Sequence, residues 1–162
     1  MIDETAAEHL EAQKERRLER LFEADAQRIA RALFAYSGDW EIAFDAMAEA
    51  FSQALASRTE LRSPRRWVWS VAFRVAAGEL KVKGRTRPIT DSAYEMADPP
   101  VDLVAALAKL SPNQRAALTL YHYTGRSTRE IGRILGSSAA TVRVHLSQGR
   151  RRLRRLLEER DE

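Results

Sequence analysis

After residue 100 the sequence alternates short apolar runs with helix start and stop signals, and this punctuation restricts the chain to short helices. Residues 111–114 (SPNQ) combine an N-cap Ser, Pro at the first helical position and Gln at the capping-box position. Residues 127–130 (STRE) form a second capping box, and the helix they open stops at Gly136. Another helix starts after Asp102, and the last begins at Ser137-Ser138. The pattern predicts four helices over residues 101–162.

The first half of the chain also shows helical spacing. Its apolar residues recur at three- and four-residue intervals from Leu18 and stop at Gly38, a good helix terminator. Asp39 is placed to cap a second helix. A third begins after Ser63-Pro64 and runs to about Lys83. No segment alternates with a period of two, so we predict an all-α fold without a sheet.

Residues 84–100 separate these two groups of helices. They contain three of the five Pro and no apolar period, which is typical of a flexible linker. We therefore predict two small helical domains, residues 1–83 and 101–162, joined by this linker. Residues 1–17 show no apolar periodicity, so we predict no role for them.

Charge is distributed unevenly between the two predicted domains. Residues 101–162 carry 12 basic and six acidic residues, a net charge of +6, whereas residues 1–83 have a net charge of −1. A small basic domain is the electrostatic footprint of a protein that binds nucleic acid. The alternative is that these basic residues form a solvent-exposed surface that binds no partner.

Several classes of site are excluded by composition. The chain has no Cys and only three scattered His, so disulfides, Cys-ligated metals and thiol catalysis are excluded and a His-based metal site is disfavoured. We expect neither cofactor nor metal. No apolar run approaches the ~20 residues of a membrane span, and the acidic start does not resemble a signal peptide. We expect a soluble cytoplasmic protein.

The segment from residue 127 to residue 152 has the order of a helix-turn-helix: a short helix, a tight turn at Gly136 and a longer basic helix. In that motif the second helix enters the major groove and reads base edges near its N-terminus. Arg143 is the best base reader there, because a guanidinium can pair bidentately with guanine.

Four stretches of this region carry a family resemblance: residues 110–118 (LSPNQRAAL), 127–136 (STREIGRILG), 141–146 (TVRVHL) and 150–153 (RRRL). They resemble region 4 of bacterial sigma factors of the extracytoplasmic-function (ECF) type. The resemblance implies that this domain reads the −35 promoter element and docks on the flap of the RNA polymerase β subunit. The residues expected to contact DNA are Ser137, Ser138, Ala140, Thr141, Arg143, Val144, His145 and Arg150. His145 and Gly149 depart from the family, which often has Arg and Ala there.

Residues 45–51 (DAMAEAF) resemble the acidic helix with which the family docks on the clamp helices of the polymerase β′ subunit. The implied polymerase-binding residues are Asp45, Glu49 and Phe51. Asp45 and Glu49 are four residues apart and share a helix face. Paired carboxylates also occur in metal or acid–base sites, but no His or third carboxylate accompanies this pair.

Residues 64–74 (PRRWVWSVAFR) resemble the family helix that recognises and melts the −10 element. Melting needs cations for the backbone and aromatic surfaces for unstacked bases. The residues expected in this role are Arg65, Arg66, Trp69, Phe73, Arg74 and Lys81. Burial in the core is an equal alternative for Trp69 and Phe73, and the favoured one for Trp67. The family commonly has Asn and Asp where this chain has Arg74 and Gly78.

Together these features predict a sigma factor that directs core RNA polymerase to promoter DNA and is not itself an enzyme. The resemblance also implies an anti-sigma factor as a possible partner. The main alternative is a stand-alone dimeric helix-turn-helix regulator, which would need palindromic half-sites about one DNA turn apart. A hydrolase built on Asp45 and Glu49 lacks metal ligands.

Overall fold

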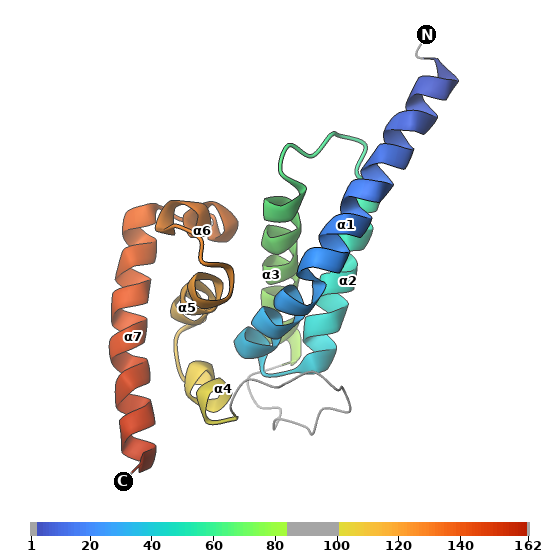
Figure 1. Ribbon diagram of the computed structural model, residues 1–162. Coiled ribbons are helices and arrows are strands. Elements are labelled where there is room, and N and C mark those ends of the chain that lie inside the picture. The colour runs from blue at the N-terminus through green and yellow to red at the C-terminus, as the bar shows by residue number, and fades with distance from the viewer. Residues whose placement is uncertain (1–2, 84–100, 162) are drawn as a thin grey trace.

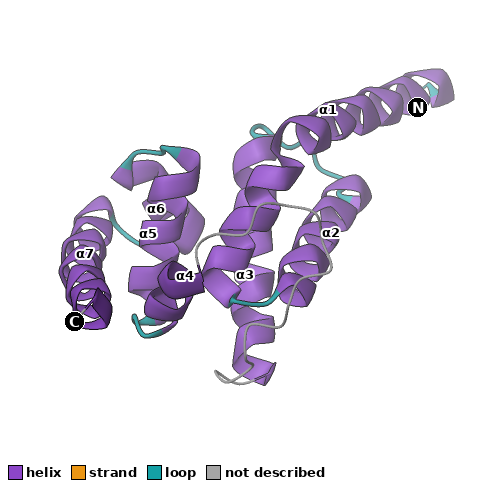
Figure 2. Cartoon of the chain, turned by 60° about the horizontal axis from the view of Figure 1, so that its bottom comes forward, coloured by secondary structure: helices purple, strands orange, loops and turns teal. Residues whose placement is uncertain are grey.

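The computed structural model describes residues 3–83 and 101–161, which form seven helices and, within those ranges, no strand (Figures 1 and 2). The helices are α1 (Glu4–Ser37), α2 (Trp40–Ala56), α3 (Pro64–Lys83), α4 (Val101–Ala108), α5 (Pro112–Thr124), α6 (Thr128–Leu135) and α7 (Ala139–Asp161). The all-α prediction is confirmed. The predicted linker, residues 84–100, lies outside the described residues.

The helix boundaries follow the capping residues of the sequence. The Asp39 carboxylate accepts hydrogen bonds from the N–H groups of Glu41 and Ile42 at 2.8 and 3.3 Å, which starts α2. The capping box of α5 forms between Ser111 and Gln114. Helices α1, α5 and α6 all end in a left-handed Gly, as the sequence pattern predicted for α1 and α6.

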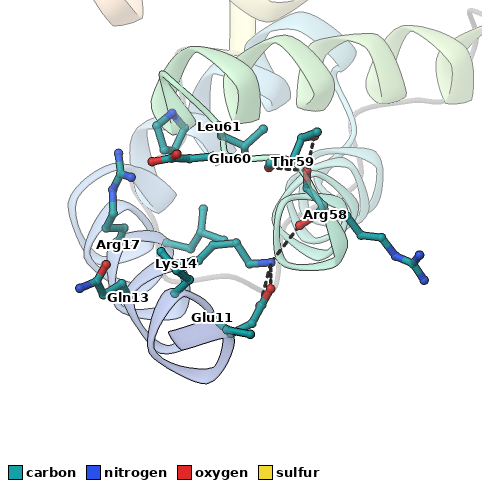
Figure 3. A pocket seen from close by; sticks show the side chains of 13 residues that line it. Glu11, Gln13, Lys14, Arg17, Arg58, Thr59, Glu60 and Leu61 are labelled. Carbon is teal, nitrogen blue, oxygen red and sulfur yellow. Dashed lines mark hydrogen bonds and ion pairs between the residues drawn. The ribbon is translucent and has the colours of Figure 1, made fainter. Parts of the chain in front are cut away.

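Helix α1 is longer than its apolar spacing predicted, because it begins at Glu4 with Asp3 as its N-cap. Its N-terminal part projects away from the other helices (Figure 1). Lys14 connects this part to the segment between α2 and α3, because its Nζ donates to the carbonyl of Ser57 at 2.9 Å (Figure 3). The same Nζ forms an ion pair with Glu11 within α1. A cavity of about 300 Å³ lies beside this contact.

The helices form two lobes. The N-terminal lobe comprises α1–α3, in which α2 packs against both other helices and Phe34 stacks on Trp40 at 4.3 Å. The C-terminal lobe comprises α4–α7, in which α7 packs across α4, α5 and α6. One hydrophobic core runs through both lobes and includes Trp69 of α3 together with Leu120 and Ile131 of the C-terminal lobe. The lobes are therefore packed together in this structure.

Candidate nucleic-acid interface

The turn between α6 and α7 is built on two glycines. Gly136 adopts φ +68° as the C-cap of α6, and its N–H and that of Ser137 both donate to the carbonyl of Gly132. A Cβ on Gly132 would lie 2.5 Å from the carbonyl oxygen of Ser137. The turn therefore passes so close to α6 that only Gly, which has no side chain, fits at position 132. Ser138 then starts α7 by accepting from the N–H of Thr141 at 3.1 Å.

The first turns of α7 present one face to the core and another to solvent. Val142 and Leu146 are buried, whereas Arg143 and Val144 are exposed. An exposed Arg beside an exposed apolar side chain near a helix N-terminus is what direct readout in a major groove requires. Of the residues predicted for −35 contact, Ser138, Ala140, Thr141, Arg143, Val144 and Arg150 are exposed, and Ser137 and His145 are half-buried.

A basic hollow of about 460 Å³ continues this surface along α7. It is lined by Tyr121, Thr128, Arg143, Leu146, Ser147, Arg150, Arg151 and Arg154. Four arginines and no acidic residue line it, which suits a run of phosphates. The Arg150 guanidinium lies 4.9 Å from the centroid of the exposed Tyr121 ring, and this contact orients it at the edge of the hollow.

On α3 the predicted aromatic DNA contacts lie in the core instead of on the surface. Trp69 is 1% exposed and Phe73 is 3% exposed, so neither ring can stack on a base in this arrangement. Trp69 Nε1 donates to the buried Asp25 carboxylate at 3.2 Å, and Arg65 Nε pairs with the same oxygen at 2.9 Å. The cations are more accessible: Arg65, Arg74 and Lys81 are exposed, and Arg66 and the neighbouring Trp67 are half-buried.

Helix α2 carries the acidic face that the sequence predicted. Asp45 and Glu49 are both exposed. Phe51 is buried, and its ring meets that of Phe22 edge-on at 5.2 Å, so it supports the face from beneath. Glu79 of α3 belongs to the same acidic field: partial burial raises its pKa, and the charge of Asp45 raises it further.

Two classes of feature are not found among the residues that the structure describes. No group of three or more His, Asp or Glu side chains there is placed to hold a metal ion. None of the helices in residues 3–83 and 101–161 is long and apolar enough to cross a membrane.

Comparison with known proteins finds one family model that matches the C-terminal lobe. Residues 101–153 match the model of the family described as sigma-70, region 4. The C-terminal lobe is therefore similar to sigma-70 region 4. The match covers α4, α5, α6 and the first two-thirds of α7, and so includes the turn at Gly132 and the basic hollow up to Leu153.

Curated relatives extend the similarity beyond region 4. The chain is 28% identical to the ECF RNA polymerase sigma factor SigE of Mycolicibacterium smegmatis, over 80% of this chain and 57% of that protein. It is 40% identical to the RNA polymerase sigma-E factor of Streptomyces antibioticus, over 45% of this chain and 40% of that protein. The chain is thus similar in sequence to these two sigma factors, and it spans about half the length of each.

Two solved structures share the fold over both lobes. The sigma factor RpoE of Bartonella quintana, co-crystallised with the anti-sigma factor NepR, superposes with a TM-score of 0.71 at 20% identity and covers 89% of this chain and 96% of its own. CnrH in complex with the cytosolic domain of CnrY gives a TM-score of 0.69 at 18% identity, covering 94% and 95%. The two-lobed helical arrangement is therefore a known fold.

Sequence reasoning missed several residues of the C-terminal lobe and of the helices packed against it. Gly132 looked like an ordinary helix residue, although a Gly inside a helical pattern often has a packing reason. Arg151 and Arg154 were not assigned, yet Arg154 follows Arg150 by four residues and Arg151 by three, and these spacings bring side chains together on a helix surface. The burial of Asp25 could not be predicted, because α1 carries many charged residues and a single acid among them is expected to face solvent.

Proposed function

We propose that this chain is a sigma factor that directs core RNA polymerase to specific promoters and initiates transcription. The observation that carries the proposal is the region 4 match over a helix-turn-helix whose reading face is exposed. The C-terminal lobe reads the −35 element through Ser138, Ala140, Thr141, Arg143 and Val144, with Ser137 and His145 at the edge of that surface. Arg150 follows the phosphates along the basic hollow.

The N-terminal lobe takes the other two tasks in this proposal. Asp45 and Glu49 offer an acidic face to the β′ clamp helices, with Phe51 as the packing beneath it. Arg65, Arg66, Arg74 and Lys81 supply cations for the −10 region. Trp69 and Phe73 contribute to melting only after α3 is rearranged, since both are buried here.

The domain division follows from these roles. Residues 1–83 act as a region 2 domain, residues 84–100 as the linker, and residues 101–162 as region 4, which also docks on the β flap. The phosphodiester chemistry belongs to the polymerase, so the chain is not itself an enzyme, and it works in the cytoplasm where promoters are. The structures of RpoE with NepR and of CnrH with CnrY make an anti-sigma factor a reasonable third partner.

Binding to core polymerase separates this proposal from a stand-alone dimeric regulator. We expect purified chain to bind core polymerase in a pull-down and to elute as one copy per polymerase. A chain that binds duplex DNA as a dimer and leaves core polymerase untouched would support the regulator instead.

Reversal of the α2 charges is expected to weaken that binding. In the double variant Asp45→Lys, Glu49→Lys, two exposed acids become cations, and like charges facing each other across an interface are strongly unfavourable. We expect the dissociation constant for core polymerase to rise about tenfold or more, measured by fluorescence anisotropy. The matched control is Glu15→Lys, Glu19→Lys on α1, also exposed and four residues apart, which should bind normally. Equal weakening by both pairs would contradict a specific role for α2.

Truncation of Arg143 is expected to relax sequence preference upstream. In Arg143→Ala the discrimination at one base pair of the −35 element should fall by ~1–3 kcal/mol, because a bidentate contact to a base is lost. The measurement is competition binding against duplexes carrying each base at that position. Arg155→Ala, also on the exposed side of α7 but outside the hollow, serves as control. A uniform loss on all sequences would show that Arg143 contacts only phosphate.

A further inference from the structure

A second basic hollow lies where α6 passes beside the N-terminal half of α3 (Figure 1). We call it the interlobe hollow, and its volume is about 240 Å³. Its lining includes Arg62, Arg66, Arg133, the Trp67 ring and the hydroxyls of Ser63 and Ser70. It shares no lining residue with the basic hollow along α7, so the two are separate features of the surface.

Three arginines from three different elements line the interlobe hollow. Arg62 belongs to the connection between α2 and α3, Arg66 to the first turn of α3, and Arg133 to the last turn of α6. None of the described residues that line the hollow is acidic. Within residues 3–83 and 101–161, the side chains of these three arginines form no hydrogen bond or ion pair. Their positive charges are thus brought together without a compensating acid.

A fourth cation and a helix end add to the positive potential of this region. Burial lowers the pKa of the Arg126 guanidinium, Glu130 at 3.6 Å raises it, and the charge of Arg66 lowers it. Arg126 therefore lies close enough to Arg66 for the two charges to interact. The first turn of α3 also has backbone N–H groups without intrahelical acceptors, and such a helix end attracts anions.

The arrangement of these charges favours a compact anion over a DNA strand. A nucleic-acid backbone spreads its charges along a line, and the basic hollow on α7 matches it with arginines that follow one another along a single helix. In the interlobe hollow the arginines instead converge from three elements on one concave site. Convergent cations in a small cleft suit a ligand that carries several negative charges on few atoms, such as a chain of phosphates.

Trp67 gives the interlobe hollow an aromatic wall. Its side chain is half-buried, because it packs against the hydrophobic core and also lines the hollow. An aromatic ring can hold any nucleic-acid base, since every base has a face that stacks. An aromatic wall beside arginines that can bind phosphate therefore suits a nucleotide. The Ser63 hydroxyl supplies a further hydrogen-bonding group in the lining.

We propose that the interlobe hollow binds the phosphate chain of a small ligand, either a nucleoside triphosphate or an inorganic polyphosphate. Arg62, Arg66 and Arg133 hold the phosphates, and in a nucleotide the base stacks on Trp67. The site goes beyond the proposed function and does not depend on it, because neither polymerase nor promoter DNA takes part in this binding.

Isothermal titration calorimetry of the full chain tests the site with two probes, ATP and inorganic tripolyphosphate, at about 0.15 M salt. We expect saturable binding of both probes, with ATP at least about fivefold tighter because its base adds stacking. Equal affinity of the two probes would also support a phosphate site and would assign it to inorganic polyphosphate. Absence of saturable binding by both probes would overturn the proposal.

Two double variants that each remove two positive charges test the arginines. Arg62→Gln, Arg133→Gln should weaken the binding of both probes about tenfold or more, because charge-assisted hydrogen bonds to phosphate are lost. The control is Arg58→Gln, Arg129→Gln, in the same connection and the same helix but outside the hollow, and it should bind normally. All four side chains are exposed, so both variants should fold. Equal weakening by both would show general charge attraction and overturn the proposal.

A third probe separates a small ligand from DNA. Arg133→Gln should bind a fluorescent single-stranded oligonucleotide as tightly as the parent chain does, measured by fluorescence anisotropy, while it binds ATP more weakly. If the same substitution weakened oligonucleotide binding about tenfold and left ATP binding unchanged, the hollow would be a DNA contact and the proposal would be overturned.

Discussion

Replacing Gly132 by Ala is expected to disable the helix-turn-helix. The added methyl carbon would lie 2.5 Å from the carbonyl oxygen of Ser137 and 3.3 Å from the carbonyl carbon of Ser138. Both neighbours are backbone, so the turn itself must move, and overpacking of this kind costs about 1–3 kcal/mol. We expect that loss in the free energy of unfolding, measured by urea titration. Because the displaced turn reorients α7 relative to α6, we also expect at least a ~tenfold loss of −35 duplex affinity.

Gly78→Ala is the matched control for this substitution. Gly78 is also a helical Gly, but a Cβ there would have no neighbour within 4 Å. Ala should therefore stabilise α3 by roughly 0.5–1 kcal/mol through its higher helix propensity. If Gly132→Ala were as well tolerated as Gly78→Ala, the close turn described here would be wrong.

Removal of the Asp25 carboxylate is expected to destabilise the N-terminal lobe strongly. Asp25→Ala leaves the buried Trp69 N–H without its acceptor and opens a small cavity, and together these cost about 2–4 kcal/mol. The lost pairing with Arg65 adds little, because that side chain is 56% exposed and its charge is screened. Urea unfolding followed by Trp fluorescence measures the change.

Asp25→Asn separates the hydrogen bond from the charge. Trp69 and Arg65 both contact the same carboxylate oxygen, Oδ2, which the amide oxygen of Asn can replace. We expect Asn to cost about 1 kcal/mol or less, since the acceptor for the indole N–H is kept. Glu23→Ala, an exposed acid on the same helix, should change stability by less than ~0.5 kcal/mol. A larger loss with Asn than with Ala would contradict this account.

The local structure of this chain could be predicted well from its sequence because its signals are local. A Ser or Asp side chain caps the helix that follows it within three residues, and a left-handed Gly ends the helix that precedes it. The starts of α2, α5 and α6 and the ends of α1 and α6 were confirmed for this reason. Even the departure at Gly149 has a packing explanation, since a Cβ there would lie 3.0 Å from Leu118 of α5.

What sequence reasoning missed depends on neighbours that are distant in the chain. Trp69 and Phe73 lie on a different face of α3 from Val68, so a single helix pattern could assign them equally to the core or to DNA. The structure buries them against α1, where Trp69 donates to Asp25 and the Phe73 ring lies 5.5 Å from that of Tyr36. Likewise the long N-terminal part of α1 has too few apolar residues to show a period, although Asp3 caps it.

Run-off transcription tests the central claim most directly. Core polymerase would be incubated with the purified chain and with linear templates that carry either an intact promoter or one with its −35 element scrambled. The account predicts a discrete transcript that depends on the chain and on the intact −35 element, and that depends less on the −35 element in Arg143→Ala. Stable DNA binding with no chain-dependent transcript from any template would contradict it.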